Sequence, residues 1–389
     1  MERDTPGVVD VISFIARQKQ ETLAKSLYAK KKIYLDMNYW IDFLKYLNGL
    51  NTRKHIPELY ELIIVLLEKD LIVIPVGDIH IMELRKNMDI NKYKTMLELM
   101  ENLSKNICFV CMDERLEHEL LFCLRYFFNI KDAHSLLINE LWTKPIFMEG
   151  TRFPVFEDDN PLKKTELGIQ NSFLDYAWNK TLREIHILMD EEKLKTLCPK
   201  DYEKELTAVL IRGREENKDD YSSFKELFRK ELWGTIDLSF AVINELLTNY
   251  FAGYEIGSSK IADSLYGIGE KKRIFYLLDL IMKSIIETKM YKILPAISIS
   301  SGLHSLKRWE INSRYKESDA FDIMHAQIAL PYCDYFLTEH NLNGLIKDKH
   351  LRFNEVFDCK IISSSEEAYK TLELLTLPHS VAVLPPFED

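Results

Sequence analysis

The sequence predicts an α/β protein with a parallel, doubly wound sheet and a large all-helical insertion. Near both ends of the chain, short apolar runs rich in β-branched residues alternate with segments of helical periodicity. This alternation is typical of parallel strands joined by helical crossovers. Between residues 113 and 292, leucine, phenylalanine and charged residues recur at helical spacing instead. We therefore expect a discontinuous core, residues 1–112 and 293–389, and a helical accessory domain, residues 113–292.

The N-terminal part of the predicted core contains three apolar runs that read as strands. They cover residues 32–35, 71–76 and 107–111. The second run is short and rich in β-branched residues, which favours a buried parallel strand over a helix. Helical periodicity marks the segments between them, and Asn48-Gly49 is a helix-stop signal. The expected helices cover residues 8–30, 38–48, 57–67 and 79–103, the last as one helix or two.

The C-terminal part of the predicted core repeats the pattern of helix and strand. We expect a loop or weak strand where serine and glycine accumulate, at residues 296–304. A helix at 320–330, a strand at 334–338, a helix at 341–347 and a strand at 359–362 follow. In the insertion, the periodicity predicts helices at residues 116–128, 171–189, 224–233, 238–250 and 274–291. Residues 145–161 read as a loop.

Composition restricts the class of protein. The chain of 389 residues has a net charge of −10, which argues against a broad, non-specific binder of polyanions. Six scattered cysteines include one CxxC pair without a matching second pair, so we expect buried thiols in a reducing compartment. The N-terminus has no secretory signal, and no apolar run approaches the length of a membrane span. We expect a cytoplasmic protein with no membrane partner.

Acidic residues stand where the predicted strands and helices meet. Asp36 ends the first strand, Glu83 lies in the helix after the second, and Asp322 opens the helix before the strand that ends at Glu339. The carboxyl ends of parallel strands share one edge of a sheet, where ligands bind. Carboxylates are preferred ligands of Mg²⁺ and Mn²⁺. The sequence therefore predicts a metal site built from these four acids, with Asp319 as a further candidate.

Around these acids the chain resembles the PIN-domain nucleases. The resemblance is carried by residues 34–38, 81–84, 322–329 and 333–339, and it covers about residues 30–112 and 305–365. It implies a PIN-like core and a Mg²⁺- or Mn²⁺-dependent endoribonuclease, in which water attacks the phosphodiester without a covalent enzyme intermediate. Two departures are Glu339, where the family usually has aspartate, and the insertion, for which the family supplies no role.

Other residues have predicted supporting roles. Asn38, Thr338 and His325 are candidates for orienting the metal-binding carboxylates. A mixture of cations and aromatic residues just before Asp322 is suited to binding RNA by phosphate contact and stacking. Its members are Lys307, Arg308, Trp309, Arg314, Tyr315 and Lys316.

Each of these readings has a structural alternative. Asp36 is also a suitable helix N-cap, acids in a first helical turn are favoured by the helix dipole, and the basic segment could be a solvated loop. Two further functions stay open: a regulatory or scaffold protein that has lost activity, and a metal-dependent nuclease that acts on DNA, either single-stranded or at flaps. The insertion could hold a protein partner or mediate self-association.

Overall fold

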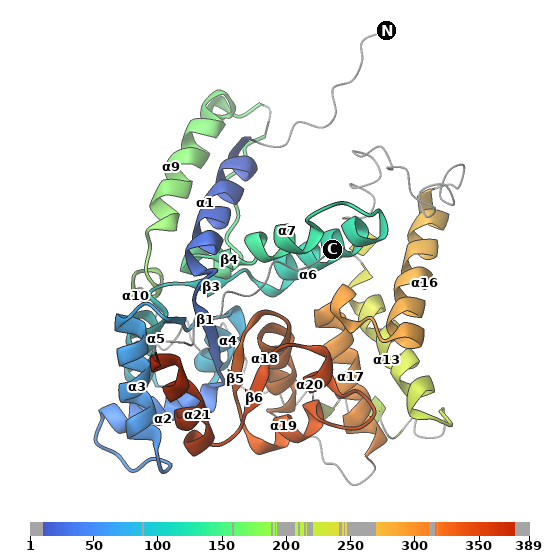
Figure 1. The fold of residues 1–389 in the computed structure, drawn as a ribbon. Coiled ribbons are helices and arrows are strands. Elements are labelled where there is room, and N and C mark those ends of the chain that lie inside the picture. The colour runs from blue at the N-terminus through green and yellow to red at the C-terminus, as the bar shows by residue number, and fades with distance from the viewer. Residues whose placement is uncertain are drawn as a thin grey trace.

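Figure 1 shows the protein as a computed structural model. The structure describes residues 11–377 with gaps. The gaps are residues 88, 158, 188, 189, 191, 193–206, 209, 210, 214, 216–220, 241, 242, 245, 247–269, 311–315 and 317. Within the described residues, none of the helices combines the length and apolar character that a membrane span requires.

A parallel sheet of four short strands joins the two ends of the chain. The strands are β1 (Lys31–Leu35), β2 (Ile72–Val73), β5 (Tyr335–Leu337) and β6 (Lys360–Ile362). Their order in the sheet is β2-β1-β5-β6, and all three pairings are parallel. The prediction of a mixed α/β fold with a parallel sheet is confirmed.

Both faces of the sheet are buried under helices, as its side-chain alternation requires. In β1, Tyr34 points into one hydrophobic core, whereas Ile33 and Leu35 point into a second core on the other face. In β5, Phe336 belongs to the core of Tyr34, and Leu337 belongs to the other.

The helices of the predicted core cover the face of Ile33 and Leu35. They are α2 (Met37–Leu47), α3 (Ile56–Glu68), α5 (Ile90–Ser104) and α21 (Ser365–Glu373). The opposite face is covered largely by α6 (Met112–Phe127), α7 (Ala133–Glu140), α13 (Phe224–Leu238), α16 (Glu270–Thr288), α17 (Pro295–Trp309) and α18 (Asp319–Tyr332). Four of these, α6, α7, α13 and α16, come from the predicted insertion. Part of the insertion therefore shares one continuous core with the sheet.

Other elements complete the described chain. They are α1 (Val11–Leu27), α4 (Asp78–Asn87), α8 (Pro145–Met148), α9 (Glu166–Trp178), α10 (Leu182–Ile185), α19 (His340–Ile346) and α20 (Phe353–Val356), with 3₁₀ turns at Pro161–Thr165, Tyr291–Ile293 and Leu374–Thr376. Helices α1 and α9 pack side by side and project from the body of the molecule (Figure 1).

The insertion is not entirely helical, so that part of the prediction is wrong. Strand β4 (Trp142–Thr143) pairs antiparallel with β3 (Cys108–Phe109). Cys108 also forms a parallel bridge with Val76. A strand of two residues between helices leaves no periodicity in the sequence, and β4 is defined only by its distant partner.

The loop or weak strand expected at residues 296–304 is also wrong, because this segment lies within α17. Its small residues are buried: Ser298, Ser301 and Ser305 are fully enclosed. Small side chains allow α17 to pack closely against α13 and α18. This packing outweighs the weak helix propensity of serine and glycine. The helix predicted at residues 238–250 lies mostly outside the described residues.

Replacement of Gly302 with alanine tests this close packing. An added Cβ would lie 2.7 Å from Phe353 and 2.9 Å from Leu351, so we expect Gly302→Ala to lower the free energy of unfolding by about 1–3 kcal/mol. Gly234 of α13 has open space around it, and Gly234→Ala should raise that free energy by roughly 0.5–1 kcal/mol. Urea denaturation measures both. Equal stabilisation by the two variants would contradict the packing described here.

Candidate functional site

Asp36 lies at the carboxyl end of β1 and is held by the neighbouring strand. The register pairs Leu35 with Leu337, so the next residues, Asp36 and Thr338, are neighbours. The Thr338 hydroxyl donates a hydrogen bond of 2.7 Å to Asp36 Oδ2, and both side chains are buried. Asp36 is also the N-cap of α2, where it accepts a 3.4 Å bond from the Asn38 amide. Asp36 therefore caps the helix and faces the sheet edge at the same time.

Asp322 is a buried acid without a partner for its carboxyl group. It lies in the first turn of α18 with 8% of its surface exposed. No hydrogen bond to its carboxyl oxygens is found within the described chain. Burial is the largest cause that raises its pKa, to about 8. The next causes are the negative charges of Asp36, Glu339, Asp319 and Glu83. The predicted acids therefore lie close enough to repel one another.

Glu83 is oriented by a buried histidine. His325 Nε2 lies 3.0 Å from a carboxylate oxygen of Glu83, and Nδ1 lies 2.8 Å from the hydroxyl of Tyr34. Burial raises the pKa of Tyr34 far above its usual value, so its hydroxyl stays protonated and donates to Nδ1. With Nδ1 as the acceptor, the N–H of the ring lies on Nε2 and donates to Glu83.

A second histidine, His80, supports this arrangement. Its Nδ1 accepts a hydrogen bond from the Gly77 amide, and its Nε2 donates to the carbonyl of Leu35. Burial lowers its pKa to about 3, so the ring is neutral. The ring centroids of His80 and His325 are 4.8 Å apart. Sequence reasoning missed Tyr34, although the strand period places it on the same face as Asp36.

Glu339 and Asn38 lie at the rim of the site. Glu339 is half-buried at the N-cap position of α19, but its side chain makes no capping hydrogen bond. Asn38 is exposed, and its backbone amide contacts Asp36. The structure brings Asp36, Glu83, Asp322 and Glu339 into one neighbourhood. As they stand, however, no three His, Cys, Asp or Glu side chains among the described residues are grouped closely enough to hold a metal ion.

Asp319 is committed to another role. Its Oδ1 accepts a 2.8 Å bond from Lys307, and its Oδ2 accepts a 2.7 Å bond from the backbone amide of Lys316. Asp319 and Lys307 are 2% and 3% exposed. Because one oxygen lies in this buried ion pair and the other accepts from a backbone amide, Asp319 has no free oxygen to offer a metal ion.

The first three residues of the predicted RNA-binding segment make contacts within the protein, and Lys307 among them is buried. Lys307 is buried against Asp319, and Arg308 pairs with Glu231 and the carbonyl of Gly213. Trp309 packs among aromatic rings, those of Tyr221, Phe224 and His350. The predicted nucleic-acid role of Lys307 and Arg308 is therefore wrong, because Asp319 and Glu231 already neutralise their charges within the fold. Lys316 is exposed, whereas Arg314 and Tyr315 lie outside the described residues.

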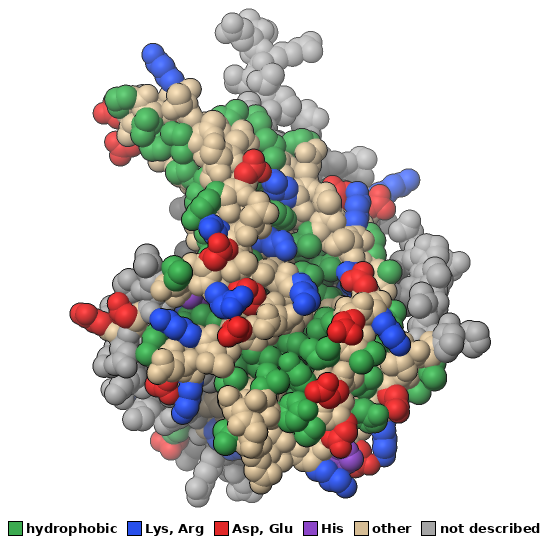
Figure 2. Space-filling view, turned by 90° about the vertical axis from the view of Figure 1, so that its left-hand side faces the viewer, with side chains coloured by type: hydrophobic (Ala, Val, Ile, Leu, Met, Phe, Trp, Pro, Cys, Tyr) green, Lys and Arg blue, Asp and Glu red, His purple; other side chains and the backbone are tan. Residues whose placement is uncertain are grey.

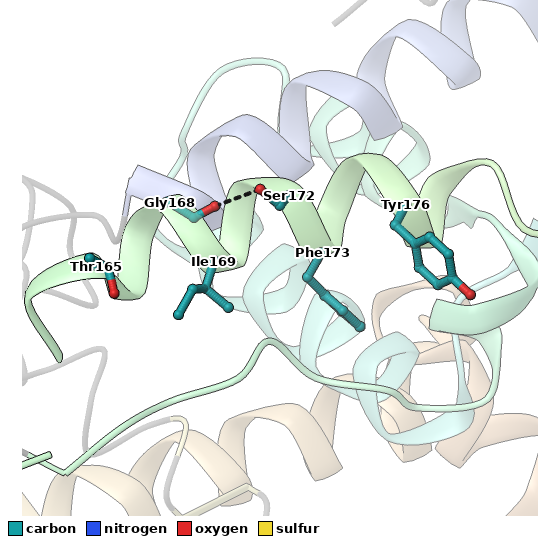
Figure 3. A pocket seen from close by; sticks show the side chains of 6 residues that line it. All are labelled: Thr165, Gly168, Ile169, Ser172, Phe173 and Tyr176. Atoms are coloured by element: carbon teal, nitrogen blue, oxygen red, sulfur yellow. Dashed lines mark hydrogen bonds between the residues drawn. The ribbon is translucent and has the colours of Figure 1, made fainter. Parts of the chain in front are cut away.

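Two other surface features lie away from the acids. A groove of 490 Å³ along α9 has no carboxylate in its lining. Figure 3 shows its lining residues, which are Thr165, Gly168, Ile169, Ser172, Phe173 and Tyr176. Figure 2 shows the face that carries α3 and α21, where basic and acidic side chains are interspersed around apolar ones. This face therefore offers no continuous basic tract to a polyanion.

Comparisons with protein-family models, with curated proteins and with solved structures gave no match.

Replacement of Lys307 tests whether its ammonium is structural. Lys307→Met leaves the Asp319 carboxylate buried without a cation, so we expect the free energy of unfolding to fall by about 3–5 kcal/mol. Lys316→Met is the matched control, because Asp319 uses only the backbone amide of that residue. Urea denaturation of both variants gives the comparison. A Lys307→Met protein as stable as the control would return Lys307 to the candidates for binding RNA.

Asp322 predicts a defined dependence of stability on pH. Its pKa is raised on folding, so the folded state holds this proton more tightly between about pH 4 and pH 8. In that range, rising pH must lower the free energy of unfolding. Asp322→Asn removes the effect, and we expect it to stabilise the metal-free protein above pH 8 by on the order of 3 kcal/mol. Thermal unfolding from pH 5 to 9 measures this difference. Parallel curves for the two proteins would show that Asp322 ionises normally.

Proposed function

We propose that the protein is a Mg²⁺- or Mn²⁺-dependent endoribonuclease whose site is formed by Asp36, Glu83, Asp322 and Glu339. One observation carries the proposal: Asp322 is buried among like charges, and no hydrogen bond to its carboxyl group is found among the described residues. Mutual repulsion of this kind is costly for a folded protein. Such acids are common at functional sites. RNA is the substrate that the resemblance to PIN-domain nucleases implies.

The chemistry of the donor set fits a hard divalent cation. All four side chains supply oxygen, and the histidine nearest to them is turned toward Glu83 and Tyr34. Such cations take oxygen ligands, often one or two carboxylates together with water and phosphate oxygens. A cation would also offset the repulsion that raises the pKa of Asp322. Because the acids are not yet grouped as a closed site, binding would have to draw their side chains together.

The surrounding residues fix the direction of two acids. Thr338 restrains Asp36 through Oδ2, and His325 restrains Glu83 through one carboxylate oxygen. Asp322 and Glu339 have no such restraint within the described chain, so their carboxyl groups are the adjustable members of the set. When bound, a divalent cation would supply Lewis-acid activation of the phosphate and of the attacking water.

A specific observation favours a second candidate function, that of a regulatory or scaffold protein without activity. Within the described residues, no three potential ligands are grouped around a common point. Glu339 also has a longer side chain than the aspartate usual in the family that the chain resembles. In this alternative, the acids would be a remnant of a site that no longer binds metal.

Cleavage and metal binding should be measured on the same preparations. We expect the full chain to cut labelled single-stranded RNA with Mn²⁺ and to stop in EDTA. Asp36→Asn and Asp322→Asn should each lower the rate by at least about a hundredfold, because each removes a charge from the site. Single-stranded DNA and a forked duplex, digested in parallel, distinguish a ribonuclease from a deoxyribonuclease.

Asp175→Asn is the control, because Asp175 is an exposed acid on α9 that pairs with Lys19. Isothermal titration with Mn²⁺ separates the two candidate functions. Binding that Asp322→Asn abolishes supports the site even if the RNA chosen is not a substrate. No Mn²⁺ binding and no cleavage by the wild-type chain would favour the scaffold.

A further inference from the structure

A cavity of 470 Å³ lies at the start of α6 and shares no residue with the acid cluster. It is lined by α1, the start of α6, β4, the segment 147–155 and α9. Its volume lies within the range of small-molecule sites, about 300–1,000 Å³. Its walls come from five separate parts of the chain, so the cavity depends on the tertiary fold.

Two buried polar side chains in the cavity have hydrogen-bonding capacity that the described protein does not use. Thr143 is 1% exposed, and its hydroxyl has no partner among the described residues. Gln20 is 7% exposed, and no hydrogen bond to its amide is found in the same part of the chain. A buried polar group without a partner costs about 1–3 kcal/mol. That cost applies to the Thr143 hydroxyl, whereas the Gln20 amide is not among the fully buried atoms and offers a donor and an acceptor to a ligand in the cavity.

The walls of the cavity are apolar and largely aromatic. Phe147 packs against Phe153 and Trp178, with ring centroids 5.8 and 6.0 Å apart, and Leu174 completes this wall. Rings in such a wall present flat apolar surfaces to a planar ligand.

The ionisable groups of the cavity balance one another. The cations are His118, Arg17 and Arg152, and the acids are Asp113, Glu114 and Glu117. His118 lies 3.3 Å from Glu140 and 3.6 Å from Glu114. Burial opposes its charge, but these two carboxylates outweigh burial and raise its pKa to about 9. Two carboxylates of the protein thus already neutralise the charge of His118. The lining therefore favours neither an anionic nor a cationic ligand.

We infer that this cavity binds a small, uncharged heteroaromatic molecule of the nucleoside class. Its base would lie against the aromatic wall, and the edge of the base would bond to Gln20 and Thr143. An amide side chain matches the adjacent donor and acceptor on such an edge, as glutamine matches adenine. This inference does not depend on the proposed nuclease activity, because the two sites share no residue.

Thr143→Val should raise the stability of the ligand-free protein and weaken nucleoside binding. Valine fills the same space without the unpartnered hydroxyl, so the ligand-free protein should unfold at a higher urea concentration than wild type. The same change should weaken nucleoside binding about fivefold to tenfold, because one hydrogen bond is lost. The probes are adenosine, guanosine, cytidine and uridine, measured with the full chain by saturation-transfer NMR and calorimetry.

Gln20→Leu should weaken binding of the same nucleoside by a similar factor. Thr22→Val is the matched control on α1, where an exposed hydroxyl bonds to the carbonyl of Gln18 outside the cavity. It should leave binding unchanged. The inference is overturned if no nucleoside binds wild type at millimolar concentration, or if binding is equally strong in Thr143→Val and Gln20→Leu.

Discussion

The parallel pairing of β1 with β5 is the contact on which the site depends. It joins residues about 300 positions apart in the chain and sets Asp36 beside Thr338. Side chains alternate along a strand, so a slip of one residue would turn Asp36 toward the opposite core and remove its hydrogen bond. The same register directs Tyr34 toward His325 and hence toward Glu83. One strand pairing thus orients two of the four acids.

The acids differ in how the protein compensates their burial. Asp36 has a hydroxyl and a backbone amide as donors, and Glu83 has an imidazole. Burial still raises the pKa of Asp36. No donor to Asp322 and no cation paired with it is found in the described part of the chain, and burial and repulsion both raise its pKa. A protein selected for stability alone would replace such a group with an apolar one, since removal of a buried charge is often neutral or stabilising. The presence of Asp322 in this position therefore favours a functional role.

Local sequence patterns predicted the strands and helices that are determined by local interactions. Four of the five apolar runs predicted the four parallel strands, whereas the fifth contains β3, which pairs antiparallel with β4. The 3.6-residue periodicity predicted most of the helices, because it records which face of a helix is buried. The edge where the acids gather also followed from the order of strands and helices. Patterns failed where a distant partner decides: β4 exists through its pairing with β3, and α17 is helical because Ser301 and Gly302 fit against other elements. Lys307 resembled a surface cation, since nothing nearby in the sequence reveals its burial against Asp319.

Some buried polar groups have hydrogen-bond partners within the described protein, and others have none. Glu119 is fully buried, and it accepts hydrogen bonds from the Tyr332 hydroxyl at 2.6 Å and from the Ala296 amide at the start of α17 at 2.8 Å. Asp319 is likewise satisfied on both oxygens. These groups join elements of the fold and need no ligand. The Thr143 hydroxyl is fully buried without such a partner, and Asp322 is 8% exposed with no hydrogen bond to its carboxyl group among the described residues. Natural proteins tolerate that cost mainly where a site uses it. The missing partner of Asp322 is best supplied by a cation, and that of Thr143 by a neutral hydrogen-bonding ligand, so the two sites call for different chemistry within one fold.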